Sequence, residues 1–151
     1  RRRLDPQCVA AAAAQVQLRA AARAKFTRAD GMLFDRVGLE QATDETVAAW
    51  KAQRFVAFEQ VGDLCCGIGG DAIALAGVTR VCAVDASAVK IALAGHNLSG
   101  YGRQAGWLTG DAALARPEAQ AVHIDPDRRT LGARRHDPQA GSPISMIFSA
   151  S

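Results

Sequence analysis

The sequence predicts an α/β fold in which a Rossmann-like parallel sheet follows a helical N-terminal cap. The first observation is that four short apolar segments alternate with helix-forming segments after Phe58, as in successive β-α-β units. The second is a glycine-rich turn between the first expected strand and the helix that follows it. We therefore expect a helical cap over residues 1–57 and a sheet domain over residues 58–151.

The composition excludes several other classes of protein. Of the 151 residues, 49% are hydrophobic and 22% are charged, and the formal net charge is +3. These values fit one globular domain rather than a disordered chain. No apolar run approaches the roughly 20 residues of a membrane-spanning helix. The cysteines at positions 8, 65, 66 and 82 lack the spacing of a metal site, so we expect no metal and reduced thiols in a cytoplasmic protein.

Two helices are expected before the sheet. Asp5 and Pro6 are typical of a helix start, and helix-forming residues continue to Phe26. A second helix is expected to begin at Thr43, because acidic residues follow it in the first turn, where the helix dipole favours them. The residues expected to be buried on these helices are Val9, Ala13, Val16, Ala20, Val47, Trp50 and Phe55.

The elements of the sheet domain follow from the alternation of apolar runs and helix formers. Strands are expected at residues 61–65, 80–85, 106–109 and 121–125. Helices are expected at residues 71–76 and 88–97, with a short helix beginning at Asp111. Asp71 is expected to stabilise a helix start, and His123 is expected to face a helix from within the sheet.

The glycine turn suits two kinds of nucleotide-like cofactor. Its glycines let a ligand lie against bare main chain, and the helix that follows offers free N–H groups. Gly67, Gly69 and Ala72, with Asp85 at the end of the next strand, satisfy a permissive dinucleotide fingerprint. An NAD(P)-binding oxidoreductase domain is therefore one alternative.

S-adenosylmethionine (SAM) accounts for more of the sequence. It adds three expectations: an acid before the glycine turn, a polar residue after the third strand, and an Asp-Pro pair after the fourth. Asp63, Asp111 and Asp125-Pro126 meet these expectations in order. Because ligands bind at the carboxyl ends of parallel strands, four matching strand ends favour SAM over NAD(P).

Four segments carry a resemblance to a known family: residues 63–76 (DLCCGIGGDAIALA), 83–85 (AVD), 109–111 (TGD) and 124–129 (IDPDRR). Together they resemble the class I SAM-dependent methyltransferases, most of all a bacterial group with a THUMP-like C-terminal domain. The turn and the upstream segment 32–43 are also similar to trimethylguanosine synthase. The resemblance implies methyl transfer to an acceptor nitrogen, with a guanine amine in RNA as one candidate.

The resemblance also implies which residues hold the cofactor. Asp63 would orient the turn or meet the methionine amino group, and Asp85 would bind the ribose hydroxyls. Asp111 would meet the adenine amino group. Cys65 stands where many relatives have the first glycine of the turn. The implied cofactor-binding set is Thr43, Asp63, Cys65, Gly67, Gly69, Asp85, Ala86, Asp111 and Ala112.

The end of the fourth strand is implied to carry the reaction. Asp125, Pro126 and Asp127 are the expected catalytic residues, because a carboxylate on a rigid turn can align an amine with the methyl donor. Amine-methylating relatives continue with Pro and an aromatic residue, so a non-catalytic SAM- or RNA-binding module is a further alternative. Arg128 and Arg129 are expected to bind the substrate. A possible RNA partner would be held through the phosphates by Arg128, Arg129, Arg134 and Arg135.

Four strands are fewer than the seven of the fold that the chain resembles. We therefore expect the 151 residues to form the cofactor-binding front of a longer protein. The sheet is then expected to be open along one edge or completed by other material.

Overall fold

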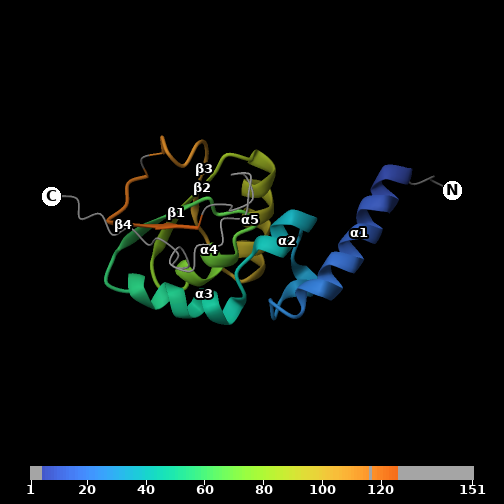
Figure 1. Ribbon diagram of the computed structural model, residues 1–151, viewed down its shortest axis with the longest axis horizontal. Helices are drawn as coiled ribbons and strands as arrows, with labels where there is room; N and C mark the ends of the chain where they lie inside the picture. The colour runs from blue at the N-terminus through green and yellow to red at the C-terminus, as the bar shows by residue number, and fades with distance from the viewer. Residues whose placement is uncertain (1–4, 116, 126–151) are drawn as a thin grey trace, which may run out of the picture.

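The sheet is four-stranded and parallel in the computed structural model, which describes residues 5–115 and 117–125. Its strands are β1 (Gln60–Leu64), β2 (Arg80–Asp85), β3 (Gly106–Thr109) and β4 (Ala121–Ile124). They lie in the order β3-β2-β1-β4, and each neighbouring pair is parallel. Figure 1 shows helices packed around this sheet. The predicted α/β fold with about four parallel strands is confirmed.

The register of the sheet brings the carboxyl ends of neighbouring strands to one edge. Leu64 of β1 pairs with Val84 of β2 and with Ile124 of β4. Residues that follow these positions therefore converge, as expected of a ligand-binding edge. One position earlier, Asp63 of β1 pairs with His123 of β4, so two ionisable residues lie side by side inside the sheet.

Two helices connect the first three strands. Helix α4 (Gly70–Leu75) joins β1 to β2, and α5 (Ala88–Gly100) joins β2 to β3. Ser87 fixes the start of α5 because its hydroxyl accepts a hydrogen bond from the Lys90 N–H at 3.4 Å.

The prediction of a short helix beginning at Asp111 is wrong. Residues 112–114 form a single turn. The Asp111 carboxylate accepts the Ala113 N–H at 2.8 Å, and the Asp111 carbonyl accepts the Leu114 N–H at 3.0 Å. The Ala115 N–H also donates to the Asp111 carbonyl at 2.8 Å, so Asp111 caps a single turn.

The segment before the sheet is helical, as predicted. It comprises α1 (Pro6–Ala22), the 3-10 helix η1 (Ala29–Gly31), α2 (Arg36–Gln41), α3 (Glu45–Ala52) and the 3-10 helix η2 (Gln53–Phe55). Figure 1 shows α1 projecting from one end of the molecule, whereas α3 lies beside α4. Within the described residues, none of these helices is long and apolar enough to span a bilayer.

The prediction of which faces of α1 and α3 are buried is wrong. Val9 and Val16 are 50% and 68% exposed, because α1 contributes only its C-terminal end, at Ala22, to the buried interior. On α3, Val47 and Trp50 are exposed and Ala48, Lys51 and Ala52 point inward. Small alanine side chains allow α3 to approach α4 closely. The buried Lys51 ammonium is paired with the carboxylates of Asp71 and Asp125. Of the predicted residues on this stretch, Phe55 is buried.

The upstream segment and the sheet region share their hydrophobic cores. One core combines Phe26, Met32 and Phe34 with Ile68 and Leu98, and all five side chains are at most 2% exposed. A second core packs Ala52 and Phe55 against residues of β1, α4 and β2. Each large apolar side chain buried in this way stabilises the fold by roughly 1.5–3 kcal/mol. The upstream segment is therefore packed against the sheet and against α4 and α5.

Candidate cofactor and acceptor site

The turn between β1 and α4 has a backbone that favours glycine. Cys65, Gly67 and Gly69 have φ angles of 63°, 55° and 88°, all in the left-handed region. A non-glycine residue there carries strain of about 1–3 kcal/mol, so Cys65 occupies a position whose geometry suits glycine. A Cβ on Gly69 would lie 3.0 Å from Leu98, whereas one on Gly67 would meet nothing within 4 Å. The turn is thus packed on one side and open at Gly67.

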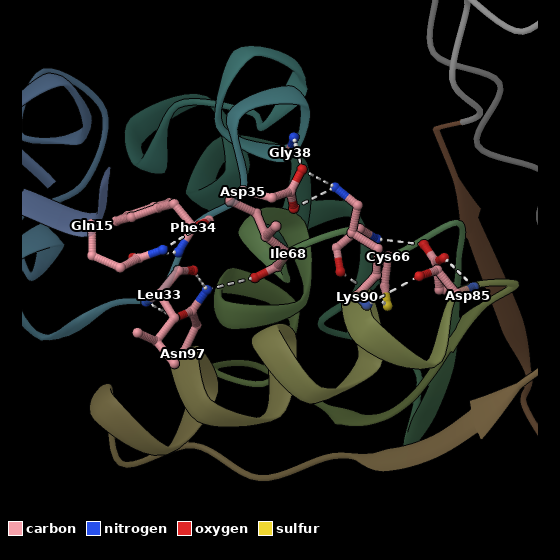
Figure 2. Close-up of polar contacts among 12 residues, drawn as sticks. Gln15, Leu33, Phe34, Asp35, Gly38, Cys66, Ile68, Asp85, Lys90 and Asn97 are labelled. Atoms are coloured by element: carbon pink, nitrogen blue, oxygen red, sulfur yellow. Dashed lines mark hydrogen bonds and ion pairs between the residues drawn. The ribbon is translucent and has the colours of Figure 1, made fainter. Parts of the chain in front are cut away.

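Asp85 fixes the open part of this turn. One of its carboxylate oxygens accepts the Gly67 N–H at 2.9 Å, and the other accepts the Ser87 N–H at 2.9 Å (Figure 2). Each carboxylate oxygen has a second lone pair, which can accept a ligand hydroxyl. The side chain expected to bind ribose therefore lies against the glycine turn, with Ala86 directly after it.

The third strand end lies beside the second. The Gly110 N–H donates to the Asp85 carbonyl at 3.0 Å, which brings the residues directly after β3 next to the end of β2. Asp111 is exposed there, and Ala112 is half-buried. The residues predicted to meet the ribose and the adenine are thus neighbours in the fold.

Beneath the glycine turn lies a group that we call the buried charge cluster. Its members come from the upstream segment, from α4 and from two neighbouring strands, and they are Thr43, Lys51, Asp63, Asp71, His123 and Asp125. The predicted residues Asp63, Thr43 and Asp125 are therefore brought together. The prediction that His123 faces a helix from within the sheet is confirmed, since its Nε2 lies 3.5 Å from the Asp71 carboxylate of α4.

Lys51 is the centre of the buried charge cluster. Its ammonium donates to the Thr43 hydroxyl at 3.0 Å, to Asp71 at 3.2 Å and to Asp125 at 3.1 Å. The Thr43 hydroxyl in turn donates to Asp71 at 2.8 Å. The Lys51 side chain is only 9% exposed, and lysine is almost never buried unless it is paired. Lys51 was not among the predicted site residues.

The cluster shifts the proton affinity of its members in different directions. Burial, together with the charges of Asp71 and Asp125, raises the pKa of Asp63 to about 7, despite the opposing charges of His123 and Lys51. Burial also acts to raise the pKa of Asp71, but the adjacent His123 ring, 3.5 Å away, and the charge of Lys51 hold it below its ordinary value. The pKa of His123 is raised, because its carboxylate neighbours outweigh burial. A proton can thus be held near neutral pH at Asp63.

A second polar network ties the upstream segment to the turn (Figure 2). The Asn97 side chain, which is 1% exposed, donates to the carbonyls of Leu33 and Ile68 and accepts the Leu33 N–H. Lys90 forms an ion pair of 2.7 Å with Asp35. Burial raises the pKa of Asp35, but the Lys90 hydrogen bond outweighs it, so the pKa lies below its ordinary value. Helix α5 thus connects residues 33–35 to the glycine turn.

Some predicted residues fall outside this description. Pro126, Asp127, Arg128, Arg129, Arg134 and Arg135 lie outside the residues that the structure describes. Among residues 5–115 and 117–125, no group of three or more His, Cys, Asp and Glu side chains could hold a metal ion.

Comparisons with known proteins agree with this geometry. Residues 58–125 match a family of RNA cap guanine-N2 methyltransferases. The chain is 36% identical over 104 residues to an uncharacterized SAM-dependent methyltransferase of Mycobacterium tuberculosis, in both strain CDC 1551 and strain H37Rv. In this region the chain is therefore similar to SAM-dependent methyltransferases. The match covers 68% of this chain but 29% of the mycobacterial relative, so the chain spans less than a third of that protein.

A solved structure shows the same likeness. A protein of Porphyromonas gingivalis W83, provisionally named a methyltransferase, superposes with a TM-score of 0.74 at 25% identity. The superposition covers 86% of this chain and 36% of that protein. Because it covers so much of this chain, the likeness extends beyond residues 58–125 into the upstream helices. The arrangement of upstream helices on a methyltransferase sheet thus occurs in another protein.

Proposed function

We propose that this chain is the cofactor-binding part of a SAM-dependent methyltransferase that methylates an acceptor nitrogen, and that the acceptor is a guanine amine in RNA. The observation that carries the proposal is the meeting of the glycine turn, Asp85, Asp111 and Asp125 at one edge of the parallel sheet. The match of residues 58–125 to the guanine-N2 family supports the choice of acceptor.

The residues present fit SAM. The bare main chain at Gly67 leaves room for a ligand, and the adjacent Asp85 carboxylate offers lone pairs to the ribose hydroxyls. Asp111, exposed after the end of β3, would accept a hydrogen bond from the adenine amino group, with the Ala112 N–H nearby. Bound SAM would supply an electrophilic methyl group on a sulfonium, which is chemistry that no side chain provides.

Asp125 would orient the acceptor. Its side chain is 34% exposed at the end of β4, and Lys51 occupies its Oδ2 atom. The carboxylate can therefore accept a hydrogen of the amine at its other oxygen and direct the nitrogen lone pair. Holding the amine in line contributes through orientation, which is a large part of many enzymic rate enhancements. In this proposal Pro126 and Asp127 complete the acceptor site, and Arg128, Arg129, Arg134 and Arg135 hold RNA phosphates.

The test is methyl transfer by the full-length protein from SAM with a labelled methyl group. Bulk RNA, protein and small-molecule fractions are offered separately, and labelled RNA is digested to identify the modified atom. We expect label in RNA, on the exocyclic amine of guanine. Label in another fraction would contradict the RNA acceptor, and SAM binding without any transfer would favour a non-catalytic module. Calorimetry that detected NAD(P) but not SAM binding would overturn the cofactor assignment.

A further inference from the structure

The buried ammonium of Lys51 is shared between two carboxylates with different surroundings. Asp71 is 14% exposed and has two further partners, the Thr43 hydroxyl at 2.8 Å and His123 at 3.5 Å. Asp125 is 34% exposed and lies at the end of β4, where the acceptor is expected. Lys51 therefore connects the closed interior of the cluster to a carboxylate at the rim of the site.

The position of the Lys51 ammonium is fixed by its contacts with Thr43, Asp71 and Asp125. Thr43 binds its ammonium, and Thr43 itself lies close to the first residue of α4, because a Cβ on Gly70 would be 3.4 Å from the Thr43 carbonyl. The neighbours Ala48 and Ala52 on the same face are each 1% exposed. A cation held this closely has few alternative positions, so it can fix the rotamer of its partner.

We propose that Lys51 is a positioning residue that holds the Asp125 carboxylate in place for the methyl acceptor. The inference deepens the proposed function and rests on it. Lys51 binds Oδ2 of Asp125 at 3.1 Å, which leaves Oδ1, as far as the described residues go, to meet the amine. Because Lys51 precedes residue 58, the upstream helices contribute to the acceptor site from outside the segment that matches the family.

The alternative role for Lys51 is structural: it neutralises Asp71 and has no effect on the acceptor. The two roles differ in whether the effect of Lys51 on turnover depends on Asp125 or on Asp71. If Lys51 acts through Asp125, removing both residues costs little more turnover than removing one, since interacting residues are not additive. If Lys51 serves only Asp71, the losses from Lys51→Met and Asp125→Asn combine independently.

The experiment is a double-mutant cycle in the full-length protein, with bulk RNA and labelled SAM. Lys51→Met is expected to lower kcat roughly 100-fold, as for a misplaced reacting group. SAM affinity should change less than about threefold, because Thr43 keeps its hydrogen bond to Asp71 and Asp85 keeps its hydrogen bond to Gly67. In the Asp125→Asn background, Lys51→Met is expected to lower kcat less than about threefold further. In the Asp71→Asn background it is expected to keep most of its effect.

Lys25→Met is the matched control. The Lys25 ammonium binds the carbonyls of Leu39, Glu40 and Ala42 at 2.8–3.1 Å and so stabilises the end of α2 without contacting the cluster. This variant should lose stability and keep kcat. Should Lys51→Met fail to fold, Lys51→Gln, which keeps a donor but no charge, replaces it in the cycle.

The outcomes separate the inference from the function. Wild-type kcat in Lys51→Met, with activity lost in Asp125→Asn, overturns the role of Lys51 and leaves the methyltransferase intact. Additive losses across the Lys51–Asp125 cycle also overturn it. A wild-type protein that transfers no methyl group to any fraction overturns the proposed function itself, and the inference with it.

Discussion

The Asp85 carboxylate and the Gly67 amide are joined by a hydrogen bond of 2.9 Å that links the end of β2 to the glycine turn after β1. The Asp85 side chain thus fixes the conformation of the glycine turn and also presents its oxygen atoms to the open space beside Gly67. Removing this carboxylate should therefore affect both the conformation of the turn and the binding of a ligand there.

Asp85→Ala is expected to weaken SAM binding at least tenfold, which corresponds to about 1.4 kcal/mol. The reason is the joint loss of the ribose acceptor and of the bond that holds the Gly67 N–H. Isothermal titration calorimetry measures the effect. Asp30→Ala serves as the control, because Asp30 forms an ion pair with Arg23 in which both side chains are at least 66% exposed. Equal losses in the two variants would contradict a specific role for Asp85.

Cys65→Gly is expected to leave the protein equally stable or more stable, by up to about 1 kcal/mol. The φ angle of Cys65 is 63°, which glycine adopts without the strain of a side chain. Cys65→Val should be clearly destabilising, since a branched Cβ is least tolerated in this conformation. Urea denaturation of the three proteins checks the order, and a valine variant as stable as the wild type would refute it.

Stability should depend on pH through Asp63 and His123. Because the folded state raises the pKa of Asp63 from 3.8 to about 7, the stabilisation from its proton is fully present below 3.8 and is lost as the pH rises to about 7. The raised pKa of His123 acts in the same direction: its contribution is present below its ordinary value of 6.5 and is lost as the pH rises through the folded value.

The Asp63→Asn variant tests this dependence. Asparagine keeps the shape of the protonated carboxyl without its titration, so the free energy of unfolding should fall less steeply between about pH 5 and 8 than in the wild type. Chemical denaturation at a series of pH values measures the slope. Parallel slopes in the two proteins would show that Asp63 is ionised in the fold throughout this range.

Asn97→Ala is expected to destabilise the protein by about 2–3 kcal/mol, because it leaves the buried Ile68 carbonyl and the partly buried main-chain groups of Leu33 without this partner. His96→Ala, on the neighbouring position of α5, removes an exposed contact to the Gly31 carbonyl and should cost much less. Thermal denaturation compares the two variants. Similar losses would mean that the Asn97 network contributes little.

The parts of the fold that depend on local sequence could be predicted. Residues 80–85 and 106–109 form strands at the predicted positions, and the glycine turn places Gly67 against Asp85, because both follow from a strand-turn-helix pattern. The buried faces of α1 and α3 were predicted wrongly, since a run of alanines and valines does not reveal which side meets a neighbour. Trp50 is exposed, with the Arg54 guanidinium 5.7 Å from its ring.

Lys51 could not be found from spacing, because its partners Asp71 and Asp125 are 20 and 74 positions away in the chain. The available signal was a lysine among alanines on one face of a helix, at positions 48, 51 and 52. A lysine on such a face must reach a carboxylate or water. Which carboxylate it reaches is decided by the packing of α3 on α4, and only the three-dimensional structure supplies that.

The close approach of Thr43 to Gly70 has a practical consequence for anyone who shortens this chain. A protein that starts at residue 58 would match the family pattern in full, yet Asp71 would lose both its hydroxyl donor and its ammonium. The apolar surfaces of Ile68 and Leu98 would also lose Phe26, Met32 and Phe34. Such a fragment would retain the recognisable motifs but expose the apolar surface that supports them, so recombinant versions should include Phe26 and the residues after it.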